Sequence, residues 1–238
     1  MPRPIPEASE VLRSLKLEPD MAEIHRSLGY PPGRLPSTDL GLLTDRLIAH
    51  ALQSLQPSGT YSLYPVQARS RHSLTLGNVT IVGEVAEHLA SADRIAAFVI
   101  TVGDAIGQLA HQSCAEGEVL SGWVYDAVGS WAAEAAASGL MDALSARLLP
   151  GQGLTLRYSP GYCGMDMAQQ GPIFDLTQAQ SIGVSLLPSW FMRPVKSISG
   201  LIGLGSETSS HSRHSPCDHC LQVKCHMRRE SQNPEGRA

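Results

Sequence analysis

Residues 157–162 read Arg157-Tyr-Ser-Pro-Gly-Tyr162 and have the composition of a ligand-binding turn. The residues before them favour a strand, so Arg157 is expected at a strand end with a turn after it. Its guanidinium can hold a carboxylate with two hydrogen bonds, while Tyr162 offers a flat face to a base or a cation. Gly161 has no Cβ and lets the backbone approach a ligand. The pattern predicts a site for a ligand with a carboxylate and an aromatic or cationic part, although a plain surface turn carries the same residues.

A second group of reactive residues lies near the C-terminus, where three of the five cysteines fall within nine residues. Cys217, Cys220 and Cys225 have the spacing C-x2-C-x4-C. Two thiolates separated by two residues can face one metal from a single turn, and the third can close the site from a short loop. The array therefore predicts a metal site, and the alternative is a basic tail with incidental cysteines.

Three thiolates leave a tetrahedral site or an iron–sulfur cluster one ligand short. For zinc, His219 or His226 is in position to complete the set. For an iron–sulfur cluster, the fourth ligand would be Cys163, which directly follows the Arg157–Tyr162 segment. The residues alone leave the choice of metal open.

The composition excludes several classes of function. Eighteen Lys and Arg residues against 22 Asp and Glu leave no basic excess, and only 5% of residues are aromatic, so nucleic-acid binding is not expected. We find no run of about 18–20 apolar residues that would span a membrane. The N-terminus has no apolar signal-peptide region, and five cysteines are too few and odd in number for a secreted disulfide scaffold. The chain is expected to be cytoplasmic.

Changes in composition divide the chain into three parts. Residues 1–70 hold nine of the sixteen prolines and predict an irregular helical wrapper, with helices around Ala8–Leu15 and Asp39–Leu55. Residues 71–205 contain most of the apolar runs and form the predicted core. Residues 206–238 are rich in Ser, His and Cys, so they predict a Cys- and His-rich metal-binding tail.

Within the core, β-branched and apolar runs predict strands at 78–82, 94–102 and 154–158. Helical periodicity predicts one helix at 105–114 and a long one at 118–148, whose apolar stripe includes Trp123 and Trp131. A further helix is expected over 173–182, with β-like segments at 184–192 and 195–201. Since strands and helices do not alternate regularly, the pattern indicates an α+β fold rather than a doubly wound sheet.

The order of several motifs resembles the activation domain of cobalamin-dependent methionine synthase. The motif Arg-x-x-Pro-Gly-Tyr at 157–162 is followed by Ile-Phe-Asp-Leu at 173–176, Ile-Gly-Val-Ser-Leu at 182–186 and Met-Arg-Pro-Val-Lys-Ser-Ile-Ser-Gly at 192–200. Upstream, the resemblance includes the strand ending Thr-Val-Gly at 101–103 and the helix with Trp-Ala-Ala-Glu-Ala at 131–135. It covers roughly residues 75–205. The rest of a methionine synthase is absent, so the chain resembles a free-standing relative.

The resemblance implies a twisted, mainly antiparallel sheet packed with helices and a site for S-adenosylmethionine. Arg157 would bind the methionyl carboxylate, and Glu134 would face the methionyl ammonium. Ser159 and Gly161 would supply backbone contacts, and Tyr162 would line the adenosine. Lys196, in Pro-Val-Lys-Ser, also falls near this site, with a solvated lysine at a strand end as the alternative.

The family's activity implies a function as a methyltransferase reactivation component in methionine biosynthesis. Such a domain holds S-adenosylmethionine over a corrinoid, so that reduction of inactive Co(II) is trapped by methyl transfer. The cobalamin would be bound by a partner methionine synthase or related methyltransferase, because this chain has no Asp-x-His-x-x-Gly motif. The electron would come from a flavodoxin, a ferredoxin or the tail, which favours an iron–sulfur cluster over zinc at the C-terminal cysteines.

Two departures from the family pattern support an alternative function. The family's methionine synthases carry aromatic residues after the Ser-x-Ser-Gly motif and a ligand tyrosine further on, whereas this chain reads Leu-Ile-Gly-Leu-Gly-Ser at 201–206 and has no later tyrosine. The loop after Tyr162 also differs. The alternative is a non-catalytic metal-binding or assembly factor that keeps the activation-domain fold.

Overall fold

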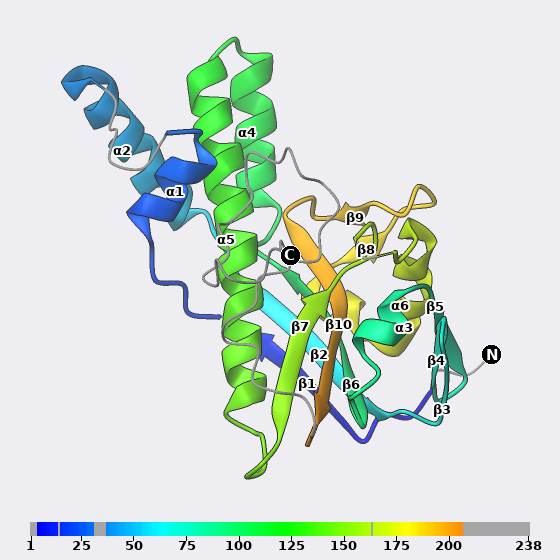
Figure 1. Cartoon of the computed structure of the whole chain (residues 1–238). Helices are drawn as coiled ribbons and strands as arrows, with labels where there is room; N and C mark the ends of the chain where they lie inside the picture. The colour runs from blue at the N-terminus through cyan, green and yellow to red at the C-terminus, as the bar shows by residue number, and fades with distance from the viewer. Residues whose placement is uncertain (1–3, 14, 31–36, 163, 207–238) are drawn as a thin grey trace, which may run out of the picture.

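The computed structural model describes residues 4–13, 15–30, 37–162 and 164–206. Its main sheet has five strands in the order β1-β2-β6-β10-β7, and each neighbouring pair is antiparallel. In chain order these strands are β1 (Ala8–Arg13), β2 (Ser58–Pro65), β6 (Arg94–Thr101), β7 (Gly153–Tyr158) and β10 (Ser197–Gly205). Strand β7 lies at one edge of the sheet, next to β10 (Figure 1).

The central strand β6 is buried on both faces and separates two hydrophobic cores. Phe98 and Ile100 belong to one core, and Ile95 and Val99 belong to the other. Successive side chains of a strand point to opposite faces. The even-numbered apolar residues of β6 therefore enter one core, and the odd-numbered apolar residues enter the other. A continuous apolar run such as 94–102 is the pattern expected of a strand covered on both faces.

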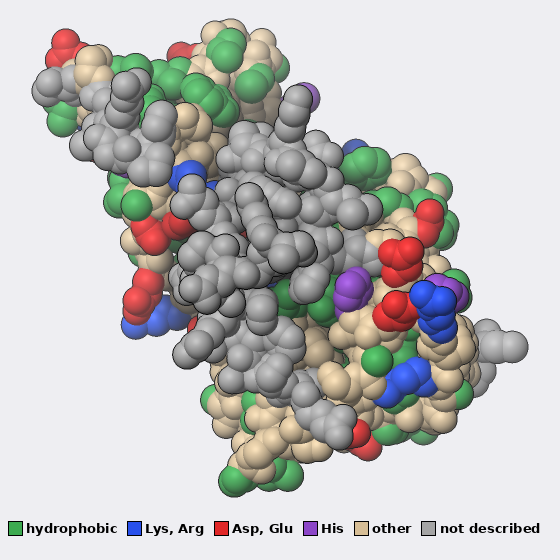
Figure 2. All heavy atoms as spheres, in the orientation of Figure 1, with side chains coloured by type: hydrophobic (Ala, Val, Ile, Leu, Met, Phe, Trp, Pro, Cys, Tyr) green, Lys and Arg blue, Asp and Glu red, His purple; other side chains and the backbone are tan. Residues whose placement is uncertain are grey.

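Helices cover the face that carries Phe98. The long helix α5 (Val119–Ser145) packs against α4 (Ala105–Ala115), α1 (Met21–Ser27) and α2 (Thr38–Gln53). Helices α4 and α5 approach closely because Gly122 has no side chain: a Cβ there would collide with the sulfur of Cys114. Figure 1 shows the ends of α2, α4 and α5 extending beyond the sheet. Exposed hydrophobic side chains, among them those of Leu42 and Val119, gather on this extension (Figure 2).

Shorter elements cover the opposite face. They include α3 (Val85–His88), α6 (Gln170–Leu176) and the 3-10 turns Met167–Gln169 and Ala179–Ile182. A three-stranded antiparallel sheet lies beside them, made of β3 (Ala68–Ser70), β4 (Ser73–Leu76) and β5 (Val79–Val82). The two short strands β8 (Ser185–Leu186) and β9 (Met192–Arg193) form a hairpin between α6 and β10. In the ranges that the structure describes, no helix is both long and apolar enough to cross a membrane.

The expected α+β class is confirmed, and two predicted elements differ from the structure. The helix expected over 173–182 is interrupted, because extended Thr177 separates α6 from the 3-10 turn Ala179–Ile182. The helix expected over Ala8–Leu15 is strand β1, whose backbone pairs with β2 from Ala8↔Leu63 to Arg13↔Ser58. Side chains strengthen this pairing, because the Tyr61 hydroxyl donates to Glu10 at 2.9 Å. The first 70 residues thus supply two strands of the main sheet as well as helices. The division of the chain at residues 70 and 205 stays a prediction.

Candidate functional site

Arg157 lies near the end of the edge strand β7, where the chain leaves the sheet. Strand pairing with β10 ends at Tyr158, which lies opposite Leu201. A compact turn follows, in which the amide of Tyr162 donates to the carbonyl of Ser159 at 3.1 Å and the amide of Gly161 donates to the carbonyl of Met165 at 2.8 Å. The strand-then-turn arrangement expected from the sequence is therefore present. It leaves the first part of β10 without a strand neighbour on this side, among the residues that the structure describes.

Gly161 is required in this turn for two reasons. Its φ of +89° is in the left-handed region, which side chains with a Cβ rarely adopt. In addition, a Cβ at this position would lie 2.9 Å from the sulfur of Met167. Glycine therefore allows the turn to close against Met167.

The two charged residues of the predicted site meet directly. Glu134 projects from α5, and its carboxylate forms an ion pair with the guanidinium of Arg157. The Arg157 side chain is only 21% exposed, whereas that of Glu134 is 54% exposed. The carboxylate of the pair is therefore open to solvent, whereas the guanidinium is mostly buried.

The other predicted contacts lie on the turn that follows Arg157. The side chain of Tyr162 is 65% exposed, so its ring is open to solvent. Ser159 is half-buried, and its carbonyl already accepts the hydrogen bond from Tyr162. Tyr158 is buried and stacks on His88 of α3, with 5.2 Å between ring centroids and 10° between planes. This stacked pair anchors the start of the turn.

A second ion pair lies farther along the same helix. The Lys196 ammonium donates to the Asp126 carboxylate at 2.7 Å and to the Ser130 hydroxyl at 2.8 Å. Asp126, Ser130 and Glu134 are spaced by four residues, so they share one face of α5. Lys196 is a residue that the sequence places near the site, whereas Asp126 and Ser130 were not predicted. Their i, i+4 spacing with Glu134 was the available signal.

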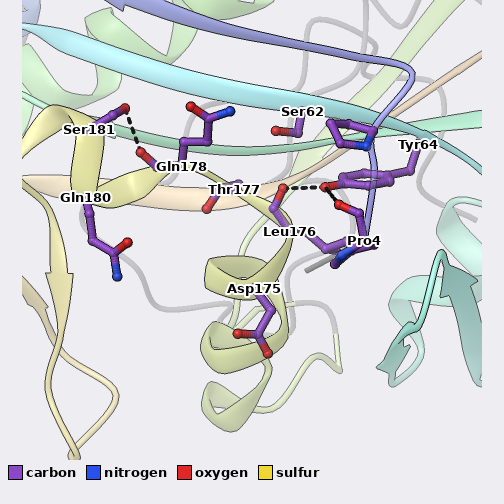
Figure 3. Close-up of a pocket in the computed structure, with 10 residues that line it drawn as sticks. Pro4, Ser62, Tyr64, Asp175, Leu176, Thr177, Gln178, Gln180 and Ser181 are labelled. Atoms are coloured by element: carbon purple, nitrogen blue, oxygen red, sulfur yellow. Dashed lines mark hydrogen bonds between the residues drawn. The ribbon is translucent and has the colours of Figure 1, made fainter. Parts of the chain in front are cut away.

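Of two cavities in the described part of the structure, one is separate from this site and the other adjoins it. One, of about 390 Å³, lies at the C-terminal end of α6 beside Tyr64, whose hydroxyl donates to the carbonyl of Leu176 at 2.9 Å (Figure 3). None of the predicted site residues lines it. The other, of about 330 Å³, is bordered by Trp190, Phe191 and Met167, and it adjoins the turn because Met167 contacts Gly161. The second cavity thus extends the candidate site.

The predicted metal ligands cannot be placed in this arrangement. Cys163, Cys217, Cys220 and Cys225 all lie outside the described residues. Within the described ranges, no group of three or more His, Cys, Asp or Glu side chains could hold a metal ion. The iron–sulfur cluster and the zinc alternative stay predictions.

Comparisons with known proteins agree with the arrangement of these elements. No curated protein matches the chain. A crystal structure of the MetH reactivation domain bound to AdoHcy is similar to it, with a TM-score of 0.66 and 18% sequence identity, over 88% of this chain and 82% of the other. At that identity the similarity shows the fold, and it supports the expected antiparallel sheet packed with helices.

A family model gives the more specific result. The model described as "Vitamin B12 dependent methionine synthase, activation domain" matches residues 67–213, which is more than half of the chain. The matched range contains β6, α5, β7 and β10, and with them Glu134 and Arg157. The chain therefore belongs to the family of activation domains of vitamin B12-dependent methionine synthase.

Proposed function

We propose that this chain binds S-adenosylmethionine at Arg157 and Glu134 and supports reductive methylation of a Co(II) corrinoid bound by a partner. The partner would be a cobalamin-dependent methionine synthase or a related methyltransferase. The observation that carries the proposal is the partly exposed Arg157–Glu134 ion pair beside the turn at 159–162. The AdoHcy bound to the similar MetH reactivation domain is the demethylated form of the same ligand.

The charges of the site match an α-amino acid. Without a ligand, Arg157 and Glu134 neutralise each other. A ligand carboxylate can replace Glu134 on the guanidinium, and the ligand ammonium can then pair with the displaced Glu134. A ligand with only one of these charges would leave one protein charge without its partner, which is costly in a partly buried site. The pair should therefore select a zwitterionic head group.

The turn would hold the rest of the ligand. Gly161 is exposed and has no Cβ, so an adenosine group can lie close to the backbone there. The exposed ring of Tyr162 can stack on an adenine, since an aromatic face is attractive to any base. Ser159 would contribute through its backbone.

The reaction divides between the two proteins. One electron from a flavodoxin or a ferredoxin would reduce Co(II) to Co(I) in the partner's corrinoid. The tail cysteines would hold the alternative electron source, an iron–sulfur cluster. The S–CH3 bond then breaks as a Co–CH3 bond forms, and S-adenosylhomocysteine is left as the product. The contribution of this chain would be to hold the sulfonium methyl group toward the partner's corrinoid, and such positioning can supply about 7–11 kcal/mol of the barrier reduction.

Thermal unfolding with and without ligand tests the binding. A ligand that binds only the folded chain stabilises it by about 2.7 kcal/mol at a concentration 100 times its Kd, and each kcal/mol corresponds to about 2–4 °C for a chain of this length. We therefore expect S-adenosylmethionine to raise the Tm by about 5–10 °C, and adenosine to raise it far less. An unchanged Tm with S-adenosylmethionine, together with a rise on adding zinc or iron, would favour the metal-binding assembly factor instead.

A further inference from the structure

Lys196 is held more firmly than a lysine at a strand end normally is. Its side chain is only 13% exposed, and its ammonium contacts Asp126 and Ser130 of α5. Its aliphatic stem lies across Gly129, where an added Cβ would be 3.0 Å from the Lys196 Cγ and 3.2 Å from its Cε. Its carbonyl accepts from the amide of Val102 at 3.1 Å. Helix α5 thus contains a glycine-lined slot that fixes the position of this cation.

The ammonium has one hydrogen-bond donor left for a ligand. A lysine ammonium carries three N–H groups. Among the residues that the structure describes, Asp126 and Ser130 accept two of them. The third can therefore serve a group that enters from the open side of the site.

The ammonium of Lys196 and the guanidinium of Arg157 contact the same face of α5. Lys196 is bound to Ser130 and Arg157 is bound to Glu134, and these two α5 residues are one helical turn apart. Side chains at this spacing are about 5–6 Å apart at Cβ. A carboxylate that accepts one hydrogen bond on each oxygen bridges donors about 7–8 Å apart, because each charge-assisted hydrogen bond spans about 2.8 Å. Lys196 and Arg157 contact successive turns of one face of α5, which is the arrangement that such a bridge requires.

We propose that Lys196 is a second cationic contact for the ligand carboxylate, opposite Arg157. This inference rests on the proposed binding of S-adenosylmethionine. In the bound state the ligand carboxylate then lies between the cations of Lys196 and Arg157, and the ligand ammonium pairs with Glu134. Asp126 is a positioning residue in this arrangement, because it holds the ammonium toward the carboxylate. The consequence is a site that depends on the carboxylate of its ligand through two protein cations.

Calorimetric titration of the full chain with two ligands tests this assignment. The ligands are S-adenosylhomocysteine and its decarboxylated analogue, which keeps the amine and the nucleoside. We expect Lys196→Met to weaken binding of S-adenosylhomocysteine about 10-fold, since a hydrogen bond to a charged group contributes about 1.5–3 kcal/mol, and to leave binding of the analogue unchanged. Asp126→Asn keeps the lysine and an acceptor oxygen, and we expect it to weaken binding of S-adenosylhomocysteine less than Lys196→Met does and to leave binding of the analogue unchanged. The matched control is Arg147→Met, which removes a cation beyond the C-terminal end of α5, and we expect it to bind both ligands as the parent does.

The other possible results of this titration distinguish between different roles of Lys196. An equal loss for both ligands in Lys196→Met and in Asp126→Asn would show that the ion pair only supports the packing of α5 on β10. No loss in Lys196→Met, with a large loss in Arg157→Ala, would overturn the assignment and leave the proposed function intact. Failure of the parent chain to bind S-adenosylhomocysteine would overturn both.

A variant that keeps Lys196 provides the same test if Lys196→Met does not fold. In Arg157→Ala the lysine remains, so S-adenosylhomocysteine should still bind at least about 3-fold more tightly than the decarboxylated analogue, given the strength of charged hydrogen bonds. Equal affinities of this variant for the two ligands would contradict a carboxylate contact by Lys196.

Discussion

Replacing Arg157 with alanine is expected to weaken binding of S-adenosylhomocysteine by about 30-fold or more. Removing one partner of a desolvated charge pair costs about 2–5 kcal/mol, and 1.4 kcal/mol corresponds to a factor of ten. The Arg157 side chain is 21% exposed, so its contacts to a ligand carboxylate are largely shielded from water. Glu134, at 54% exposure, can be solvated when its partner is lost, so the variant should still fold. Isothermal titration calorimetry at pH 7 measures the change.

Arg147→Ala is the matched control for this prediction. Arg147 also forms an ion pair with a glutamate, Glu10, at 2.7 Å, but it lies just beyond the C-terminal end of α5. We expect its loss to leave the affinity within a factor of about two, because exposed ion pairs contribute about 0–1 kcal/mol and this one is remote from the site. If Arg157→Ala binds the ligand as tightly as Arg147→Ala does, Arg157 is not part of the site.

Replacing Gly200 with alanine is expected to lower the Tm by about 2–12 °C. An added Cβ would overlap the carbonyl oxygen of Tyr158 and lie 3.0 Å from the ring of Phe98. Both neighbours are buried, and a backbone carbonyl in a paired strand cannot move aside easily. Overpacking of this kind costs about 1–3 kcal/mol, and each kcal/mol corresponds to about 2–4 °C in a chain of this length. Differential scanning calorimetry measures the shift.

The same substitution at Gly139 should have the opposite sign. Gly139 lies inside α5, and an added Cβ there would meet no atom within 4 Å. Alanine is favoured over glycine in a helix interior by about 1 kcal/mol, so Gly139→Ala should raise the Tm by a few degrees. A destabilisation of similar size in both variants would show that the close approach of β7 and β10 at Gly200 does not account for the effect.

The strongest local patterns predicted the central elements well. The β-branched run at 94–102 became the buried strand β6, and the periodic segments at 39–55 and 118–148 became α2 and α5. Prediction was less successful where tertiary contacts decide the outcome. β1 is a strand because it pairs with β2, about 50 residues away along the chain. The local sequence around β1 contains no information about this partner. Trp123 is half exposed, whereas Trp131 is buried, because the first turns of α5 extend beyond the sheet.

Most residues of the candidate site could likewise be predicted from the sequence, whereas the contacts between them could not. The residue pattern at 157–162 predicted Arg157 and the family resemblance added Glu134, and the structure brings the two into contact although they are 23 residues apart. The ion pair between Lys196 and Asp126 joins residues 70 positions apart. Spacing could not predict either contact, because both depend on how α5 crosses the end of β7 and the start of β10. The roles of Ser159, Gly161 and Tyr162 in ligand binding remain predictions.

The central claim is that this chain supports methylation of a partner's corrinoid, and the absorbance spectrum of that corrinoid tests it most directly. A cobalamin-dependent methionine synthase without its own activation domain is placed in the Co(II) state with reductant and S-adenosylmethionine. Adding this chain should produce the spectrum of methylcobalamin, release one S-adenosylhomocysteine per corrinoid and restore turnover, whereas Arg157→Ala should do so far more slowly. A corrinoid that stays Co(II) in the presence of a chain shown to bind S-adenosylmethionine would contradict the account.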